Sequence, residues 1–317
     1  MVEAITQESI YEPVADDLQA VIAEIATIAD RAPENSPEQA DDLDAQLGHV
    51  LATPGKRVRP ALTLLASRLF GEGRGEMQIK MATAVELLHI ATLVHDDTVD
   101  HADTRRGHQT ASKLWGRNVA VLIGDFIFAT SAMYVCDTNN VRLVRRFAET
   151  ITELARGELN EIYTAWKPGV PLKDYSQRIY DKTASLFCTA AESGAVLGGG
   201  DEAAVKNVRD YGYNIGMAYQ VYDDLLDYSA TSEELGKPAG HDLGEGILTL
   251  PAIIAAENGA SEEILALMNA PRETRADLLP GAVEAVKQTR ALEKTLKVAN
   301  NYIESAVSSL DNIPASE

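Results

Sequence analysis

The chain has 317 residues, of which 45% are hydrophobic and 24% are charged, and its formal net charge is −20. This composition is typical of a globular protein with a sizeable core. The negative charge argues against a nucleic-acid partner, because binding to phosphate backbones needs basic surface. An anionic substrate would need metal ions or clustered Lys and Arg to reverse the local field.

The cysteines and the apolar segments indicate in which cellular compartment the protein works. Cys136 and Cys188 are too few for a disulfide framework and fit a reducing cytosol, and we expect both to be buried as small hydrophobic residues. The N-terminus shows no basic region followed by an apolar core, and no uninterrupted apolar run has membrane-spanning length. We therefore expect a cytoplasmic protein without stable membrane insertion.

Nearly every segment is typical of helix. Apolar spacing, with proline and glycine at the ends, predicts helices over 18–29, 61–70, 81–94, 119–135, 141–166, 172–197, 203–228 and 283–310. Residues 31–44 are predicted as a loop, and we find no alternating strand pattern. The sequence thus predicts one all-α domain over residues 1–317, a helical bundle with a central apolar cavity. Residues 1–45 would form its N-terminal helix and loop.

One acidic pattern occurs twice, each time at the end of an apolar segment. The first copy has Asp96, Asp97 and Asp100, and the second has Asp223, Asp224 and Asp227. Positions i, i+1 and i+4 share one face of a helix, where like charges repel. One copy would equally fit a solvated helix end. Two copies favour Mg²⁺, which takes oxygen ligands and commonly bridges carboxylates to substrate phosphates.

Basic residues lie near both acidic motifs in the sequence. Lys56, Arg57 and Arg59 form a cationic run before Pro60, where a helix N-terminus would favour an anion. Alone this run would be a solvated turn, but it stands out in so acidic a chain. Arg105 and Arg106 follow the first acidic motif. Lys182 lies within a helical pattern, Lys237 follows the second motif, and His89 lies seven residues before Asp96.

In their order along the chain, these motifs resemble those of the trans-isoprenyl diphosphate synthases of the polyprenyl synthetase family. The resemblance covers residues 55–251. Its elements are Gly55-Lys56-Arg57-Val58-Arg59-Pro60, Glu86-Leu87-Leu88-His89, the first aspartate motif, Arg105-Arg106-Gly107, Gly124-Asp125, Lys182-Thr183-Ala184, Gln220 with the second aspartate motif, and Gly236-Lys237-Pro238.

The resemblance implies an isoprenoid synthase fold and an enzyme that joins isopentenyl diphosphate to an allylic diphosphate. It implies that six aspartates bind Mg²⁺, three ions per active site, with the allylic diphosphate bridging the motifs: Asp96, Asp97, Asp100, Asp223, Asp224 and Asp227. Arg105, Lys182 and Lys237 would hold that diphosphate. Lys56, Arg59, His89 and Arg106 would hold the diphosphate of isopentenyl diphosphate. Thr183 and Gln220 would lie near the reacting carbons and stabilise the cation.

The implied reaction has three steps. The allylic C–O bond ionises, helped by Mg²⁺ and cationic side chains at the leaving pyrophosphate. The double bond of isopentenyl diphosphate attacks the cation in a pocket that excludes water. A proton then goes to the departing pyrophosphate, since no dedicated base is evident. The family also implies a homodimer, for which the small residues of 190–200 would permit close helix contact.

Two positions depart from the family pattern. Ile247 stands where a lysine is common, and His241 stands where a small hydroxyl residue is frequent. The first departure removes one possible phosphate contact. Neither changes the core set, so we still expect activity.

Product length is read from residues one helical turn before the first motif. One turn rises about 5.4 Å, close to one isoprene unit. Family members that stop at C15 usually have an aromatic residue there, whereas Ala91 and Thr92 are small. We therefore expect a product longer than C15, in the C30–C50 range. The pocket floor would lie at Met81, Val85, Leu88, Phe128 or Met133. Alternatively, the two small residues serve helix packing.

Other functions remain open. The chain could be a short-chain (C15–C20) synthase, or a non-catalytic partner subunit of a heteromeric synthase, although such subunits tend to lose an aspartate motif. A terpene cyclase or a squalene/phytoene-type synthase would not need Lys56, Arg59 and Arg106, because it binds no isopentenyl diphosphate. A helical interaction protein would need no paired metal faces.

Overall fold

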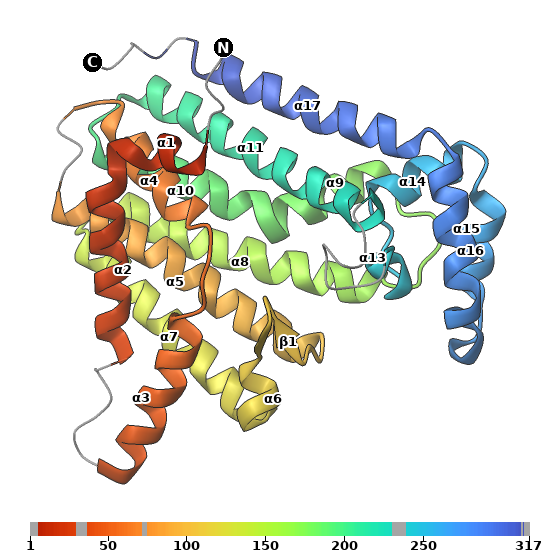
Figure 1. Cartoon of the computed structure of the whole chain (residues 1–317). Coiled ribbons are helices and arrows are strands. Elements are labelled where there is room, and N and C mark those ends of the chain that lie inside the picture. The colour runs from red at the N-terminus through yellow and green to blue at the C-terminus, as the bar shows by residue number, and fades with distance from the viewer. Residues whose placement is uncertain (1–5, 30–36, 72–74, 230–238, 312, 314–317) are drawn as a thin grey trace. The chain divides into compact units, whose positions relative to one another are not determined.

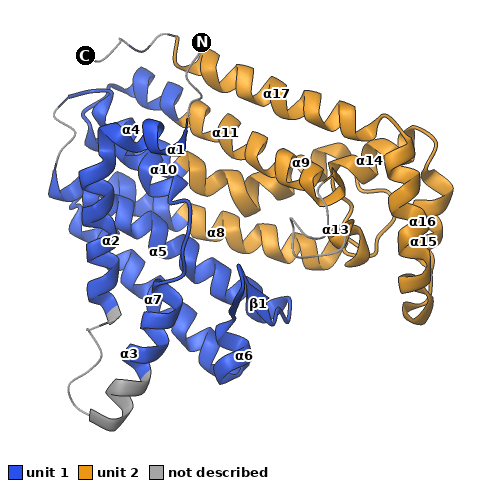
Figure 2. Ribbon diagram, viewed as in Figure 1, with its two compact units in different colours: residues 1–148, 189–208, 313–317 blue, residues 149–188, 209–312 orange. Residues whose placement is uncertain are grey.

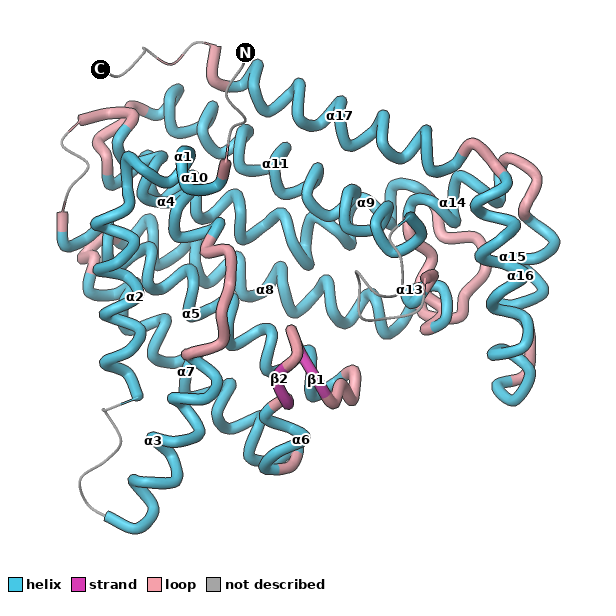
Figure 3. The backbone as a smooth tube through the Cα atoms, viewed as in Figure 1, coloured by secondary structure: helices cyan, strands magenta, loops and turns pink. Residues whose placement is uncertain are grey.

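The computed structural model describes residues 6–29, 37–71, 75–229, 239–311 and 313 (Figure 1). Within these residues the regular structure is helical apart from one short hairpin (Figure 3). The predicted all-α class is therefore confirmed. The chain divides into a first unit, residues 1–148, 189–208 and 313–317, and a second unit, residues 149–188 and 209–312 (Figure 2). One domain with a central cavity stays a prediction.

The first unit is built around one long buried helix, α5 (Glu76–Val99), which packs against α2, α4 and α7. Its other elements are α1 (Gln7–Tyr11), a 3-10 turn (Glu12–Val14), α2 (Ala15–Ala29), α3 (Pro37–Leu51), α4 (Val58–Arg68), β1 (Thr104–Arg105), β2 (His108–Gln109), α6 (Ala111–Trp115) and α7 (Arg117–Asp137). Parts of α8 (Val141–Thr164), α10 (Ser185–Leu197) and α11 (Glu202–Ser229) also belong to it.

Glycines allow close approach between helices of the first unit. A Cβ on Gly124 of α7 would lie 2.2 Å from Nε2 of His95 on α5. A Cβ on Gly194 of α10, or on Gly198 just after this helix, would lie 2.2 Å from a backbone carbonyl oxygen of α4. The small residues of 190–200 therefore pack within the chain. Their role in contact between two copies stays a prediction.

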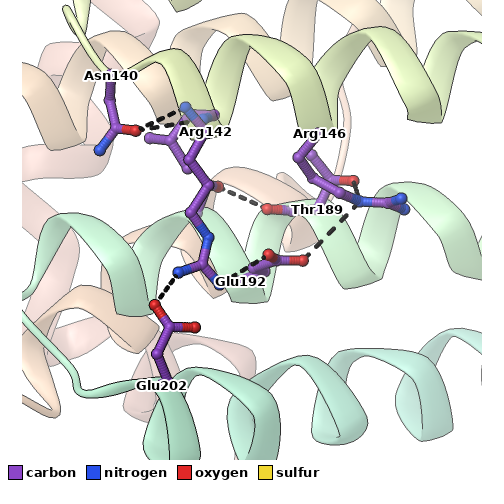
Figure 4. A network of polar contacts seen from close by, with 8 residues as sticks. Asn140, Arg142, Arg146, Thr189, Glu192 and Glu202 are labelled. Carbon is purple, nitrogen blue, oxygen red and sulfur yellow. Dashed lines mark hydrogen bonds and ion pairs between the residues drawn. The ribbon is translucent and has the colours of Figure 1, made fainter.

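A polar network, buried at Arg146, Thr189 and Glu192, joins α8, α10 and α11 within the first unit (Figure 4). Arg142 pairs with Glu192 at 3.3 Å and with Glu202 at 2.6 Å. Nε of Arg146 donates to Oγ1 of Thr189 at 3.1 Å and lies 4.0 Å from Glu192. The side chains of Arg146 and Glu192 are only 6% and 8% exposed. Such a network fixes the relative register of these helices, because neither charge tolerates burial without its partner.

The second unit places α9 (Leu172–Ile179) and the later part of α11 among the C-terminal helices. One π-helical turn (Tyr180–Ala184) joins α9 to α10. The remaining elements are α13 (His241–Gly244), α14 (Leu250–Glu257), α15 (Ser261–Asn269), a 3-10 turn (Arg272–Thr274), α16 (Arg275–Gln288) and α17 (Ala291–Ser309). Their core includes Tyr175, Met217, Tyr228 and Leu267.

The structure corrects several local predictions. The loop predicted over 31–44 gives way to α3 from Pro37, where proline fits the first helical turn. The predicted helix over 283–310 is two helices that meet at Thr289. The hairpin was not predicted, because each strand has two residues. Cys188 is buried as expected, whereas Cys136 is exposed.

Two described helices, α5 and α7, are long and apolar enough to cross a membrane by length and composition alone. Core helices pass the same test, and the most apolar window of α5 is 61% buried. The window of α7 is only 44% buried. Met133 of α7 was predicted as a possible floor of the product pocket. Its side chain is 62% exposed, so it does not line an internal pocket of this chain. Met81, Val85 and Leu88 of α5 are fully buried.

Candidate active site

The first aspartate motif lies at the C-terminal end of α5. This end of a helix carries partial negative charge, so carboxylates here need compensation. Asp97 is buried, and both of its carboxylate oxygens accept hydrogen bonds from Nε of Arg105, at 2.8 and 2.9 Å. Asp96 is half-buried, and Asp100, the C-cap residue, is exposed. Arg105 thus binds the motif directly.

The hairpin that carries Arg105 explains the Arg105-Arg106-Gly107 motif. Arg106 has φ 50° and Gly107 has φ 82°, and positive φ at both central positions is typical of a type I′ turn. Glycine tolerates this conformation best. Nη1 of Arg106 donates to the carbonyl of Pro54. A Cβ on Gly55 would lie 3.0 Å from the same Nη1. The hairpin therefore lies against Pro54 and Gly55, just before the cationic run.

His89 lies among these arginines. Burial lowers the pKa of His89 well below 6.5, and the positive charges of Arg59, Arg106, Arg105 and Arg57 lower it further. The structure therefore places the charges of Arg59, Arg106 and Arg105 near His89. Positive charge concentrated at one place in a chain of net charge −20 is suited to binding an anion.

Two members of the cationic run differ in role. Lys56 is exposed, and its carbonyl oxygen accepts hydrogen bonds from Nε2 of Gln7 at 2.8 Å and from the hydroxyl of Tyr11 at 3.0 Å. Arg57 pairs with the buried Glu86 at 2.5 Å. Arg57 therefore fastens the start of α4 to α5, while the ammonium group of Lys56 is accessible to a ligand.

In the second unit, Asp224 of the second aspartate motif takes part in a network of side-chain hydrogen bonds. The hydroxyl of Thr183 donates to Oε1 of Gln220 at 2.6 Å, and Nε2 of Gln220 donates to Oδ1 of Asp224 at 2.9 Å. The hydroxyl of Tyr175 donates to Oδ2 of Asp224 at 2.7 Å. The structure thus joins Thr183 to Gln220 and connects both to Asp224.

The carboxyl group of Asp224 has a raised pKa. Burial raises its pKa to about 6, and the charge of Asp223 acts in the same direction. Hydrogen bonds from Gln220 and Tyr175 and the charge of Arg178 oppose this rise. The same burial, together with Asp224, raises the pKa of Tyr175 well above 10, so its hydroxyl stays protonated and donates.

Lys182 lies in the π-helical turn, a feature frequent at functional sites. Its ammonium is 2.5 Å from Glu161 and 3.2 Å from Glu158, both on α8. Gly157 permits this approach, because a Cβ there would lie 2.6 Å from the backbone nitrogen of Lys182. Lys182 is therefore held by carboxylates that a diphosphate would have to displace or share.

Asp227 is held by the backbone of α13. Its Oδ1 accepts from the amide of His241 at 3.1 Å, and its Oδ2 accepts from the amide of Asp242 at 3.3 Å. The pKa of Asp242 is raised well above 3.8 by burial and then by the charges of Asp227 and its neighbours. His241 thus contributes through its backbone, so a different side chain there is tolerated. Lys237 lies outside the described residues.

Sequence reasoning missed Tyr175, Glu158, Glu161 and Asp242. One signal was present for Tyr175, which lies seven residues, about two helical turns, before Lys182. The glutamates carried no motif of their own. Their contact with Lys182 depends on how α8 packs against the π-helical turn, which spacing along the chain does not reveal.

The donor set fits Mg²⁺ bound together with a ligand. Both motifs offer carboxylate oxygens, which this hard ion prefers. Among the described residues, no group of three or more His, Cys, Asp or Glu side chains already has the arrangement of a metal site. Mg²⁺ usually keeps waters and binds through one or two carboxylates plus substrate phosphates rather than in an all-protein cage. The aspartates therefore fit an ion that arrives with a diphosphate.

Comparison with known proteins assigns the family. The model of the Polyprenyl synthetase family matches residues 40–286. The chain belongs to the polyprenyl synthetase family. Heptaprenyl diphosphate synthase component 2 of Geobacillus stearothermophilus is 36% identical over 310 residues, covering 98% of this chain and 94% of that protein. Octaprenyl diphosphate synthase of Escherichia coli (strain K12) is 35% identical over 271 residues, covering 85% of this chain and 84% of that protein.

A solved polyprenyl synthetase agrees in fold. The crystal structure of polyprenyl synthase from Caulobacter crescentus CB15, complexed with calcium and isoprenyl diphosphate, is 33% identical to this chain. It matches with a TM-score of 0.87 and covers 100% of this chain and 94% of that one. The resemblance inferred from the motifs is confirmed.

Proposed function

We propose that this chain is a trans-polyprenyl diphosphate synthase that condenses isopentenyl diphosphate with an allylic diphosphate. The observation that carries the proposal is the group of arginines whose charges act on the half-buried His89, with Arg105 of the same group bound to the first aspartate motif. A diphosphate site beside a metal-binding motif is what this reaction requires. The matching family supports the same conclusion.

The residues of the first unit bind and orient. Arg59, Arg106, His89 and the accessible Lys56 hold the diphosphate of isopentenyl diphosphate. Arginine suits this role because its planar fork binds phosphate oxygens in pairs. The carboxylates of the first motif bind the metal ions that accompany the allylic diphosphate, and Arg105 serves the same anion.

The residues of the second unit act at the allylic diphosphate. Mg²⁺, when bound, neutralises negative charge that develops on the departing pyrophosphate. Lys182 and Lys237 hold that pyrophosphate, and Asp223, Asp224 and Asp227 bind metal. The oxygens of Thr183 and Gln220 direct the negative ends of their dipoles at the allylic cation, a form of preorganised electrostatic stabilisation. The proton that the condensed product loses passes to the departing pyrophosphate.

We propose a product longer than C15, in the C30–C50 range. The names of the two relatives, heptaprenyl and octaprenyl diphosphate synthase, support this range. The positions one turn before the first motif are occupied by the small residues Ala91, fully buried, and Thr92. Both lack the aromatic ring that would end the chain early.

We also propose that two copies associate through α7. Leu122 and Met133 on this helix are 66% and 62% exposed, although the helix is strongly apolar. Large exposed apolar residues on one helix are typical of an association surface. Leu122→Glu should convert a dimer to a monomer in size-exclusion chromatography with light scattering. A wild-type monomer would contradict this proposal.

The test of function is incubation of the purified chain with Mg²⁺, isopentenyl diphosphate and farnesyl diphosphate, followed by chromatography of the dephosphorylated products. A ladder that ends at one long chain is the expected result. One relative is named as component 2 of a synthase, which favours a second reading, a subunit that needs a partner. That reading predicts no elongation by the chain alone with any allylic primer.

A further inference from the structure

The segment that follows the second aspartate motif lies against one face of α16 in the second unit. Three glycines make this possible: a Cβ on Gly240 would lie 2.3 Å from Val283, one on Gly244 would lie 3.0 Å from Leu279, and one on Gly246 would lie 2.3 Å from the indole of Trp166. Gly240 and Gly246 also have φ of 72° and 77°, which a side chain would strain.

Trp166 ties this segment to both α8 and α16. Its amide donates to the carbonyl of Gly246 at 2.9 Å, and its indole ring lies against the backbone of that residue. Cζ of Arg275 lies 3.5 Å from the centre of the indole, within the range of a cation–π contact. Arg275, Leu279 and Val283 are spaced by four residues, so they share one face of α16.

Backbone strain at Trp166 indicates that the contact is specific. Its φ is 62°, in the left-handed region that a bulky residue adopts only where the surrounding structure imposes it. The amide of Trp166 meets the carbonyl of Gly246, and the positive φ turns the chain that follows this residue. The geometry of the whole segment therefore depends on where the indole lies.

The held segment is the one that binds Asp227. The amide of Gly240 donates to the carbonyl of Asp227 at 2.8 Å, and the amides of His241 and Asp242 donate to its two carboxylate oxygens. The segment is closed by the amide of Ile247, which donates to the carbonyl of Asp242 at 2.9 Å. The orientation of the Asp227 carboxylate is thus set by a segment that Trp166 holds in place.

We propose that Trp166 and Arg275 form a latch, the contact of the indole with Gly246 and with the guanidinium of Arg275, that positions Asp227 for metal binding. Both are positioning residues, because they act through α13. The inference rests on the proposed function, in which Asp227 binds Mg²⁺ with the allylic diphosphate. Partners that orient a metal ligand commonly change metal affinity by 10- to 100-fold when removed.

The test compares Trp166→Ala, Trp166→Phe and Arg275→Gln with the wild-type chain. The Mg²⁺ concentration that gives half-maximal condensation should rise about 10-fold in Trp166→Ala. The KM for isopentenyl diphosphate should stay within about twofold, because His89 and its arginines belong to the first unit. Trp166→Phe keeps a ring against Gly246, so its Mg²⁺ requirement should lie between those of the wild type and Trp166→Ala. Arg272→Gln, a change at an exposed arginine beside α16, is the matched control and should behave as wild type.

Two measurements do not require turnover. Hydrogen exchange followed by mass spectrometry should show faster exchange over residues 239–249 in Trp166→Ala. Calorimetry with Mg²⁺ and inorganic pyrophosphate should show weaker binding by the same variant. These readouts still test the latch if the wild-type chain fails to condense substrates, so failure of the proposed function is told apart from failure of the latch.

A double-mutant cycle tests the contact itself. Gly246→Ala should weaken Mg²⁺ activation in the wild-type background and weaken it less in Trp166→Ala, where the indole is absent. Unchanged exchange over 239–249 in Trp166→Ala would overturn the latch. Faster exchange with an unchanged Mg²⁺ requirement would show a structural contact only, and would overturn its role in positioning Asp227.

Discussion

The hydroxyl of Thr183 donates a hydrogen bond to Oε1 of Gln220 at 2.6 Å. Because the hydrogen points at Gln220, the lone pairs of the threonine oxygen are directed elsewhere, as stabilisation of a nearby cation requires. Gln220 is itself oriented by its hydrogen bond to Asp224. A residue of the second aspartate motif thereby sets the direction of two dipoles.

Thr183→Val removes the hydroxyl while keeping the shape of the side chain. We expect kcat for condensation to fall about 100-fold, as when a preorganised polar group is removed from other active sites. The KM for isopentenyl diphosphate should change little, because that substrate is held by other residues. Thr183→Ser keeps the hydroxyl and serves as the control. Equal rates for the valine and serine variants would refute the dipole role.

The buried Asp224 should make stability depend on pH in the metal-free protein. Its pKa is raised from 3.8 to about 6, so the folded state binds this proton more tightly than the unfolded state. The resulting stability is fully present below the unfolded pKa and is lost as pH rises through about 6. Two pKa units correspond to about 3 kcal/mol.

The measurement is the free energy of unfolding in EDTA, for wild type and Asp224→Asn, between pH 7.5 and 4.5. The wild type should gain stability relative to the variant as pH falls from 7 to 5. A lost hydrogen bond in the variant adds only a constant offset. Parallel curves would show that Asp224 has no raised pKa.

His89 should take up a proton when an anion binds beside it. Burial and neighbouring arginines keep its pKa well below 6.5, and the negative charge of a diphosphate opposes those arginines. Calorimetry of isopentenyl diphosphate binding without Mg²⁺, in buffers of different ionisation enthalpy at pH 6.5, should show more proton uptake in wild type than in His89→Gln. The exposed His101→Asn variant should match wild type. Equal uptake by all three proteins would place the diphosphate elsewhere.

Ala91→Phe should shorten the product. Ala91 is fully buried on α5, one turn before the first motif. A phenyl group there would fill the space into which we propose that the product chain grows. The size of the product, determined by chromatography, should move towards C15. Thr92→Phe, at a half-buried position, serves as a second variant if the first destabilises the protein. Unchanged products from two folded variants would assign these small residues to helix packing.

Glu192→Ala should destabilise the first unit. Glu192 is nearly fully buried and lies beside Arg142 and Arg146, so its removal leaves buried positive charge less well paired. The expected loss is about 3 kcal/mol in the free energy of unfolding. Glu202→Ala removes a partner of Arg142 that is 85% exposed and should cost less than about 1 kcal/mol. Similar losses for both variants would contradict the importance of burial.

The sequence predicted long helices better than short elements. The buried helix α5 and the helix α11 were recognisable because many apolar residues repeat at helical spacing. The early part of α3 has few apolar residues, so its sequence gave no helical period. The hairpin depends on positive φ at Arg106 and Gly107, and two residues in each strand are too few for an alternating pattern.

The site was predicted in its composition but not in its pairings. The spacing of Asp223, Asp224 and Asp227 placed them on one helix, and the family resemblance named Lys182. Neither revealed that Glu161 on α8 holds Lys182, or that Tyr175 donates to Asp224. Such contacts join residues from different helices, so they depend on tertiary packing.

The central claim is that the chain joins isopentenyl diphosphate to an allylic diphosphate with loss of pyrophosphate. The most direct test measures, in one reaction with Mg²⁺ and farnesyl diphosphate, both the labelled isopentenyl units incorporated and the pyrophosphate released. Each condensation releases one pyrophosphate, so we predict a ratio of one. Pyrophosphate release without incorporation, as from a cyclase, or neither event in a folded protein with Mg²⁺, would contradict the claim.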